Sequence, residues 1–289
     1  MSIRDTFLAI SVPLLWGIGF VITKPGMEYF PPMLINGLRW SITGLVLVWW
    51  FPIPKPYLIK LFFISFISCT LQYSLTFSGL NIIDASSAVL FVQFEVPFGI
   101  LIAFFLLKER PNIQNLIGLV IAFVGLIVLS GAPNLEGKYL GVALVLSGAF
   151  TWSLGQVFVK PITQKLNGVI ITAWFGILAG PQLIIASQLI EGNVIDHIIS
   201  ANYQGWLIVL YLALLMNALG YSIWYYVLGI FTINKILPVM LLLPVTGVIT
   251  AIVFLGERPG LKVYIGGIII LIGVSIILFN KKENIIRKT

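Results

Sequence analysis

The sequence predicts an all-α integral membrane protein, with ten transmembrane helices arranged as two inverted five-helix repeats. Composition is the first observation: 59% of the 289 residues are hydrophobic and only 9% are charged, against about 25% charged residues in a soluble domain. The second is a series of apolar runs of membrane-spanning length. The third is a set of motifs that occur once in each half of the chain. Together they predict a chain whose solvent is largely lipid.

The apolar runs, taken in order, predict the ten helices, because a helix needs roughly 20 residues to cross the hydrocarbon core. In the first half they cover residues 6–23, 32–51, 57–80, 85–107 and 112–130. In the second half they cover residues 137–160, 168–190, 204–228, 234–255 and 261–280. Proline, glycine and polar segments separate the runs and predict the turns between helices. The first run is too long for the apolar part of a signal peptide, so we interpret it as an uncleaved span.

Basic residues outside the spans predict the orientation. Twelve of them fall on the side that holds both termini: Arg4, Lys55, Lys60, Lys108, Arg110, Lys160, Lys165, Lys235, Lys281, Lys282, Arg287 and Lys288. The other side has four: Lys24, Lys138, Arg258 and Lys262. Because cytoplasmic loops carry an excess of Lys and Arg, we expect both termini in the cytoplasm. We expect the chain to be a multi-pass protein of the cell (inner) membrane.

The two halves share sequence. WGIGFVITKP at residues 16–25 returns as WSLGQVFVKP at 152–161, an offset of 136, and LKERP at 107–111 returns as LGERP at 255–259, an offset of 148. Each copy holds an odd number of predicted spans, so the two copies must cross the membrane in opposite directions. The predicted division is residues 1–132 and 133–289, forming one transport unit with its site between them. This arrangement is typical of secondary transporters.

Enzymatic chemistry has little support in the residues. Cys69 and His197 are each the only residue of their type, and the chain contains neither a phosphate-binding loop nor an HExxH motif. Nothing in the sequence calls for a metal, a nucleotide or a haem, so we expect no cofactor. The net charge of +7 is explained by cytoplasmic loops, and we expect no nucleic-acid partner.

Two charged residues lie deep inside predicted spans, where a charge costs at least ~2.5 kcal/mol on insertion scales. Arg39 is in the second span and Glu95 in the fourth. One interpretation is a structural lock in which the two side chains pair. The other is a cavity site, where Arg39 takes a substrate carboxylate and Glu95 a substrate amine or a proton. Glu95 is therefore the candidate for proton coupling.

Other polar and aromatic side chains also fall within spans. The candidate polar lining is Gln72, Tyr73, Gln93, Gln156, Asn217 and Tyr221, and the candidate aromatic walls are Trp16, Trp152, Trp174 and Trp224. A single buried amide or tryptophan is often a packing feature between helices. Their concentration at mid-span favours a polar cavity with aromatic walls, which suit apolar or cationic groups.

Four further residues are candidates for gating. Pro97 and Pro244 interrupt the fourth and ninth spans at corresponding places, either as fixed kinks or as hinges. Lys24 and Lys160 close the first and sixth spans, either as snorkelling residues that complement a helix C-terminus or as symmetric gates. Glycines repeat every seven residues along the fifth, sixth and tenth spans, which predicts close helix packing.

These motifs resemble one known family. The segments are Trp16-Gly17 with Phe20 and Lys24, the Leu38-Arg39-Trp40 motif, the Glu-Arg pairs at 109–110 and 257–258, and the glycine-rich fifth and tenth spans. In this order and duplication they are similar to the EamA family of the drug/metabolite transporter superfamily, over about residues 8–280. The resemblance implies ten helices in two inverted repeats and, usually, export of a small metabolite.

Within that family, the segments PPML at 31–34, LQY at 71–73 and GYSIW at 220–224 resemble exporters of cysteine-pathway metabolites such as O-acetylserine and cysteine. Those exporters carry Gln-x-Gln in the fourth span, whereas this chain has Gln93-Phe94-Glu95. A carboxylate in place of an amide changes the charge, so substrate identity stays open.

We therefore expect an exporter of amino acids or amino-acid-related metabolites, acting by alternating access as a monomer or homodimer in the lipid bilayer. A carrier of another small solute, such as an aromatic amino acid, an amine or a nucleoside-type solute, in either direction, is the alternative. A non-transporting membrane assembly subunit is the alternative of another class.

Overall fold

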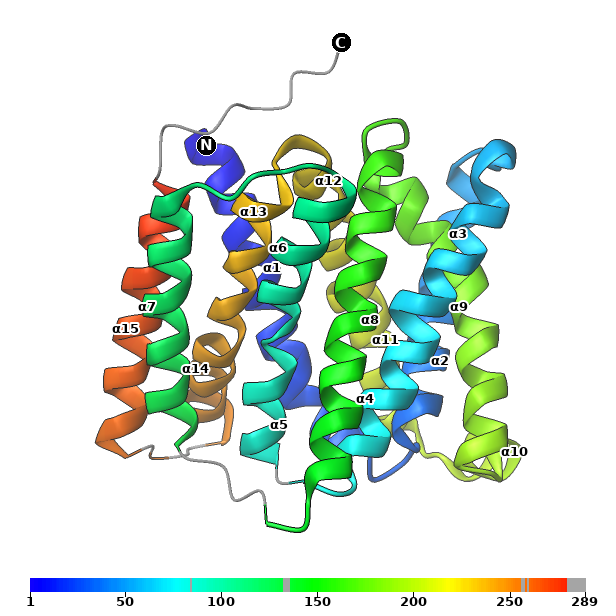
Figure 1. Cartoon of the computed structure of the whole chain (residues 1–289). Coiled ribbons are helices and arrows are strands. Elements are labelled where there is room, and N and C mark those ends of the chain that lie inside the picture. Colours follow the sequence, from blue (N-terminus) through cyan, green and yellow to red (C-terminus); the bar gives the residue numbers. More distant parts are fainter. Residues whose placement is uncertain (84, 132–135, 256–257, 259, 280–289) are drawn as a thin grey trace.

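The computed structural model is an all-helical bundle and describes residues 1–83, 85–131, 136–255, 258 and 260–279. Figure 1 shows the long helices side by side along one common direction, with α1 beginning and α15 ending at the same face. Within the described ranges, nine helices are long and apolar enough to cross a membrane. Residues 132–133, where the two halves are expected to meet, Glu257, and residue 280, the expected end of the last span, lie outside those ranges.

The first half forms five rods. They are α1 (Ile3–Gly26); α2 (Pro32–Leu47), followed by the short turns η1 (Val48–Trp50) and η2 (Lys55–Tyr57); α3 (Leu58–Ser65) with η3 (Phe66–Leu71) and α4 (Gln72–Leu80); α5 (Ala85–Val92) with α6 (Glu95–Leu106); and α7 (Ile113–Ser130).

The second half also forms five rods. They are α8 (Tyr139–Thr163); α9 (Gly168–Ile190), followed by the short α10 (Val194–Ser200); α11 (Tyr203–Tyr211) with η4 (Leu212–Tyr221) and α12 (Ser222–Ile230); α13 (Ile233–Ile236) with η5 (Leu237–Leu242) and α14 (Leu243–Leu255); and α15 (Leu261–Leu278).

The described helices follow the expected spans, with one shorter rod. Expected span 168–190 is α9 at the same bounds, because Asn167 caps its first turn through the backbone N–H of Val169. The expected second span, 32–51, instead ends its α-helix at Leu47 and continues as a tighter 3-10 turn. At about 1.5 Å per residue α2 is roughly 24 Å long, so it is not among the nine long helices. Trp49 and Trp50 follow it and are exposed.

Glycine faces bring pairs of helices from the two halves into backbone contact. A Cβ added at Gly44 of α2 would lie 2.4 Å from the backbone nitrogen of Ile177 in α9, and one at Gly176 would lie 2.4 Å from the nitrogen of Gly44. In the same way, a Cβ at Gly125 of α7 would lie 2.8 Å from the carbonyl oxygen of Gly266 in α15. These faces confirm the packing role that the glycine spacing predicts.

The glycine stripe of α8 packs against the third rod. Added Cβ atoms at Gly148 and Gly155 would lie 2.2 Å from Thr76 Oγ1 and 2.1 Å from Ser68 Cβ. Because the third rod supplies several of the predicted site residues, this close approach places them beside α8.

The packing contacts between the two halves form matched sets. α1 packs against α14 and against the η4–α12 rod, while α8 packs against α6 and against the η3–α4 rod. The α2–α9 and α7–α15 pairs each join corresponding helices of the two halves. Apolar side chains such as Val120 and Ile268 are exposed on the outer faces of the last pair, as a lipid-facing surface requires.

Candidate functional site

Two π-helical segments mark the centre of the bundle. η3 (Phe66–Leu71) interrupts the third rod and η4 (Leu212–Tyr221) interrupts the eighth, at places related by the repeat offset of 148. Such segments shift the normal hydrogen-bond ladder and frequently occur at functional sites. In η4, two carbonyl groups accept from other helices: Trp16 Nε1 donates to the Met216 oxygen at 3.1 Å, and Thr43 Oγ1 donates to the Ala213 oxygen at 2.8 Å.

Arg39 of α2 projects toward η4 and α4. Its side chain is 3% exposed. One terminal nitrogen, Nη1, donates to Met216 Sδ at 3.0 Å; the other, Nη2, donates to the hydroxyl of Tyr73. The guanidinium carbon also lies 5.4 Å from the centre of the Tyr73 ring. Both sequence-predicted residues, Arg39 and Tyr73, are thus brought together, with Met216 as a partner that had not been predicted.

The structural lock between Arg39 and Glu95 does not form. In the described part of the chain no ion pair joins these two side chains, and the guanidinium of Arg39 donates to Met216 and Tyr73 instead. Depth within a span predicted their level in the membrane but not which helices face each other, and Arg39 faces α4 and η4 instead of α6.

An aromatic cluster adjoins the arginine. The Trp16 ring centre lies 4.6 Å from that of Tyr221 and 6.0 Å from that of Trp224, and Trp224 lies 6.1 Å from Trp152. Trp40, next to Arg39 in sequence, has its ring centre 4.7 Å from Tyr221. The cluster draws on α1, α2, α8 and the η4–α12 rod, so both halves contribute. All five rings are buried, which closes the cluster in this conformation.

Gln156 holds one edge of the aromatic cluster. Its side-chain oxygen accepts a hydrogen bond from Trp224 Nε1 at 2.7 Å, and both residues are fully buried. The amide and the indole were both predicted site residues, and the structure brings them into direct contact. This bond fixes the plane of the Trp224 ring against α8.

Glu95 and Gln93 stand at the break in the fourth rod. The α-helix stops at Val92 and resumes at Glu95, because Pro97 has no N–H for the Gln93 carbonyl four residues earlier. That carbonyl instead accepts from the backbone N–H of Val96 at 3.1 Å. Ser153 of α8 donates to the Glu95 backbone oxygen at 2.6 Å, and the Gln93 side-chain oxygen is buried without a partner.

Pro244 has a matching effect in the ninth rod. The segment before it, η5 (Leu237–Leu242), is a 3-10 helix, and the α-helix resumes only at Leu243. The predicted interruption of the fourth and ninth rods at Pro97 and Pro244 is therefore confirmed as local structure.

The remaining predicted residues are spread around this centre. Gln72 donates to Thr76 Oγ1 at 3.3 Å within its own helix. Trp174 packs against the core with an unpartnered indole nitrogen, and both amide atoms of Asn217 in η4 are buried without a partner. Gln72 thus acts within α4, whereas Asn217 has hydrogen-bonding capacity that the protein itself does not use.

Lys160 forms a buried clamp at one end of the bundle. Its ammonium donates to the backbone oxygens of Leu228 and Phe231, at the C-terminal end of α12. On the other side of this corner, Glu109 accepts from the backbone N–H of Ile233 at 2.8 Å and acts electrostatically on Lys160. A cation at a helix C-terminus and an anion at a helix N-terminus are both favourable.

The snorkelling interpretation of Lys160 is wrong, because its side chain is 2% exposed and turns inward to carbonyl groups of a neighbouring helix. The predicted counterpart, Lys24, has a side chain outside the described part of the structure.

Glu191 caps α2 from the polar turn after α9. Its carboxylate accepts from the backbone N–H groups of Met33 at 2.8 Å and Leu34 at 3.2 Å, and from Ser187 Oγ at 2.7 Å. Sequence reasoning missed Glu109 and Glu191 in these roles. The sequence shows that each carboxylate follows a span. The helix start that each one caps lies more than a hundred residues away in the chain, at Ile233 and at Met33, so the pairing was not predictable.

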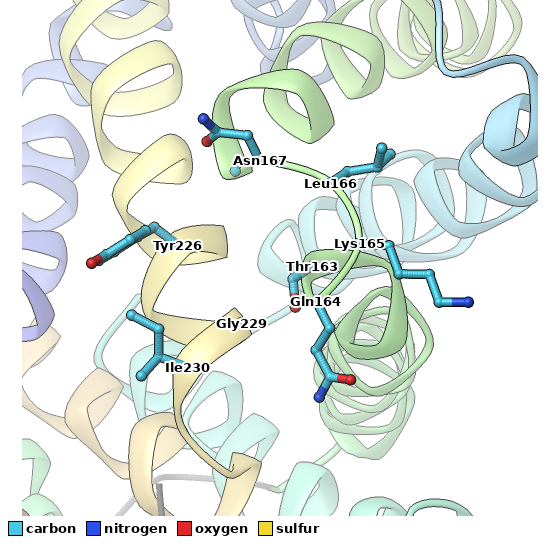
Figure 2. A pocket seen from close by; sticks show the side chains of 9 residues that line it. Thr163, Gln164, Lys165, Leu166, Asn167, Tyr226, Gly229 and Ile230 are labelled. Carbon is cyan, nitrogen blue, oxygen red and sulfur yellow. The ribbon is translucent and has the colours of Figure 1, made fainter. Parts of the chain in front are cut away.

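A cavity of about 220 Å³ lies elsewhere, between the turn after α8 and α12 (Figure 2). Its walls are Thr163, Gln164, Lys165, Leu166, Asn167, Gly168, Tyr226, Gly229 and Ile230. None of the predicted site residues lines it, so it is separate from the aromatic cluster. It lies at the end of α8 that carries Lys160.

Comparison with known proteins agrees with this architecture. The chain matches the EamA-like transporter family over residues 5–131 and again over 139–279. It is 30% identical to a "Probable amino-acid metabolite efflux pump" of Salmonella typhimurium and 29% identical to one of Escherichia coli, with 96% of each chain covered. It is 26% identical to an uncharacterized inner membrane transporter of Escherichia coli, over 74% of this chain and 71% of that one.

A solved crystal structure shares the fold, with a TM-score of 0.80 at 18% identity, covering 94% of this chain and 96% of the other. Two family matches in one chain suggest a duplicated arrangement. The chain is thus a multi-pass membrane protein and a transporter of a small molecule, not an enzyme: it belongs to the EamA-like transporter family.

Proposed function

We propose that this protein is an inner-membrane secondary transporter that exports amino acids or amino-acid-related metabolites by alternating access. The observation that carries the proposal is the shared central site: Arg39 and Tyr73 of the first half meet Met216 of the second. A site between two halves is what a rocking carrier requires. The printed names of the two amino-acid metabolite pumps support the substrate class.

The ten rods form, in this proposal, two inverted five-helix repeats, residues 1–132 and 133–289. Supporting it are the recurring packing pairs, α1 with α14 and α8 with α6, and the common face at which α1 begins and α15 ends (Figure 1). The excess of basic residues on the side of the termini supports a cytoplasmic position for both of them. In such an arrangement the inward-open and outward-open states are near mirror images.

The proposed substrate site is the buried centre. Its polar members are Arg39, Gln72, Tyr73, Gln93, Glu95, Gln156, Asn217 and Tyr221, and its aromatic members are Trp16, Trp152, Trp174 and Trp224. Full burial of most of them describes a closed state, and substrate enters when one end of the bundle opens. Glu95, at the break of the fourth rod, is the proposed carrier of a coupling proton.

The proposed gates are the breaks and clamps at the two ends. The Lys160 clamp holds the corner between α12 and α13, at the face where α1 begins, and Lys24 occupies the repeat-related place. Pro97 and Pro244 provide the flexible points, because a missing helix hydrogen bond lets the two parts of a rod move separately.

The test is flux in sealed proteoliposomes. Purified protein is reconstituted with labelled cysteine, O-acetylserine or phenylalanine inside, and efflux is compared with protein-free liposomes and with Lys60→Gln, a charge removal at an exposed position. We expect efflux of at least one solute in the wild type and in Lys60→Gln. A protein that moves none of these solutes in either direction would refute the proposed substrate class.

A further inference from the structure

The most unusual buried group in the molecule is the guanidinium of Arg39. It is 3% exposed, and its acceptors in the described structure are a thioether and a phenol. Its Nε has no partner. A buried charge is normally paired with an opposite charge, because water has been removed from it. Here a phenol and a thioether, which is a weak acceptor, leave the positive charge uncompensated.

The surroundings of Arg39 contain more free donors than free acceptors. Trp40 Nε1 is also buried without an acceptor, and both amide atoms of Asn217 are buried without a partner. These groups belong to one neighbourhood: Arg39 contacts Met216, which precedes Asn217, and Tyr221 interacts with both Arg39 and the Trp40 ring. A surplus of buried donors around a cation requires an acceptor-rich anion.

The described side chains do not supply that anion, since the partners of the Arg39 guanidinium are Met216 and Tyr73 and no ion pair joins it to Glu95. The position is central rather than at a helix end, so an anion reaches it only as cargo. We propose, on the basis of the proposed export function, that Arg39 is the anchor for the carboxylate of the substrate and that the transporter requires a carboxylate on its cargo.

The geometry of the side chain suits this role. The planar guanidinium presents a fork of N–H groups that matches the two oxygens of a carboxylate. The hydroxyl of Tyr73 accepts from Nη2, and Tyr73 is only half-buried. It is therefore the side of the Arg39 site that lies nearest to the surface. Beyond the fork, the rings of Trp16, Trp40 and Tyr221 provide an apolar wall for the rest of the substrate.

A thermal-unfolding experiment on purified protein tests the assignment. The probes are cysteine, cysteamine, which lacks the carboxylate, 3-mercaptopropionate, which lacks the amine, and inorganic phosphate. We expect cysteine and 3-mercaptopropionate to raise the unfolding temperature of the wild type by mass action, and cysteamine and phosphate to leave it unchanged. Binding of cysteamine as strong as that of cysteine, or a wild type that no carboxylate probe stabilises, would overturn the proposal, as would stabilisation by phosphate alone.

Three variants separate an anchor from a packing residue. In Arg39→Met, which keeps the length of the side chain, the apparent affinity for the carboxylate probes falls roughly ten- to a hundredfold, as for loss of a charged hydrogen bond. The unfolding temperature without ligand does not fall, because the uncompensated charge is gone. Arg39→Lys keeps the charge, loses the fork and gives an intermediate affinity. Arg110→Met, a matched change at an exposed position, behaves as the wild type.

Two outcomes would overturn the anchor. One is an Arg39→Met variant that loses much ligand-free stability while Arg39→Lys binds carboxylates as well as the wild type does. The other is an Arg39→Met variant whose affinity for the carboxylate probes is unchanged. Neither of these binding outcomes decides the result of the flux experiment. Export of amino-acid metabolites together with a failed anchor would leave the transport function standing, whereas a flux-free protein that still binds carboxylates through Arg39 would refute export alone.

Discussion

Replacing Gly44 with alanine tests the contact between α2 and α9, where the two halves meet most closely. The new Cβ would lie 2.4 Å from the backbone nitrogen of Ile177 and 2.6 Å from the carbonyl carbon of Gly176. Backbone atoms cannot rotate away, so the two helices must separate by about 1 Å to reach ordinary van der Waals distance. The strain is therefore spread along the whole α2–α9 pair.

The magnitude follows from a comparison with Gly247→Ala. A Cβ at Gly247, in α14, meets nothing within 4 Å, so that variant reports only the higher helix propensity of alanine, about 1 kcal/mol. Gly44→Ala has the same propensity gain and in addition the overpacking penalty of about 1–3 kcal/mol. The difference between the variants is then roughly 2–12 °C in unfolding temperature.

The assay is thermal unfolding of both variants in one detergent, followed by tryptophan fluorescence, together with flux in proteoliposomes. We expect Gly44→Ala to unfold at the lower temperature and to transport more slowly than Gly247→Ala. Equal unfolding temperatures would show that an added methyl group at residue 44 causes no overpacking, and therefore that α2 and α9 do not approach as closely as the structure has them.

Three further changes probe the site and the clamp. Glu95→Gln flattens the dependence of flux on pH if Glu95 carries the coupling proton, and an unchanged profile across the neutral range would dismiss it. Gln156→Leu leaves the buried Trp224 indole without its 2.7 Å acceptor and lowers the free energy of unfolding by about 1–3 kcal/mol; Trp224→Phe added to it recovers part of this loss, and simple additivity in a double-mutant cycle would contradict the contact. Lys160→Met leaves the Leu228 and Phe231 carbonyls unpaired, so backbone hydrogen exchange at residues 230–233 speeds up; exchange as slow as in the wild type would rule out the clamp.

The sequence predicted the rods where their ends carry local chemistry. The polar residues after Ile190 predicted the end of α9, and the structure adds the Asn167 cap at its start; caps and stop signals are properties of a few neighbouring residues. The glycine spacing of α7 and α15 predicted their close packing for a similar reason: a run of small residues on one face has few other uses in a membrane.

The breaks within rods were predictable only in part. Pro97 indicated a break in the fourth rod, and the break lies at Gln93–Phe94, where the Gln93 carbonyl accepts from the Val96 N–H because residue 97 has none. The π-helical segments η3 and η4 have no such signal, since neither contains a proline. In η4, side chains of neighbouring helices, Trp16 and Thr43, donate to the backbone carbonyls of Met216 and Ala213, and only the packed bundle contains this information.

The partners of buried charges were not predictable. A position within a span gives the depth of Arg39 and Glu95 but not the direction in which each side chain points, so the sequence left both a lock and a cavity site open, and the lock does not form. The contact between Arg39 and Met216 was not predictable because methionine is an apolar residue and gives no sequence signal of a polar partner. The snorkelling interpretation of Lys160 was wrong for the same reason. The sequence shows that Lys160 ends its own helix, but it does not show that its side chain reaches the backbone after α12.

Cys69 provides the most direct test of alternating access, because it is the only cysteine in the chain and lies buried in the central neighbourhood of Arg39 and Tyr221. The measurement is its modification by a membrane-impermeant methanethiosulfonate, applied to one side of sealed membranes at a time, with and without O-acetylserine, which has no thiol to consume the reagent. With alternating access, we expect slow modification of Cys69 from both sides, at rates that the transported solute changes on each side. Modification from one side alone under every condition would contradict it.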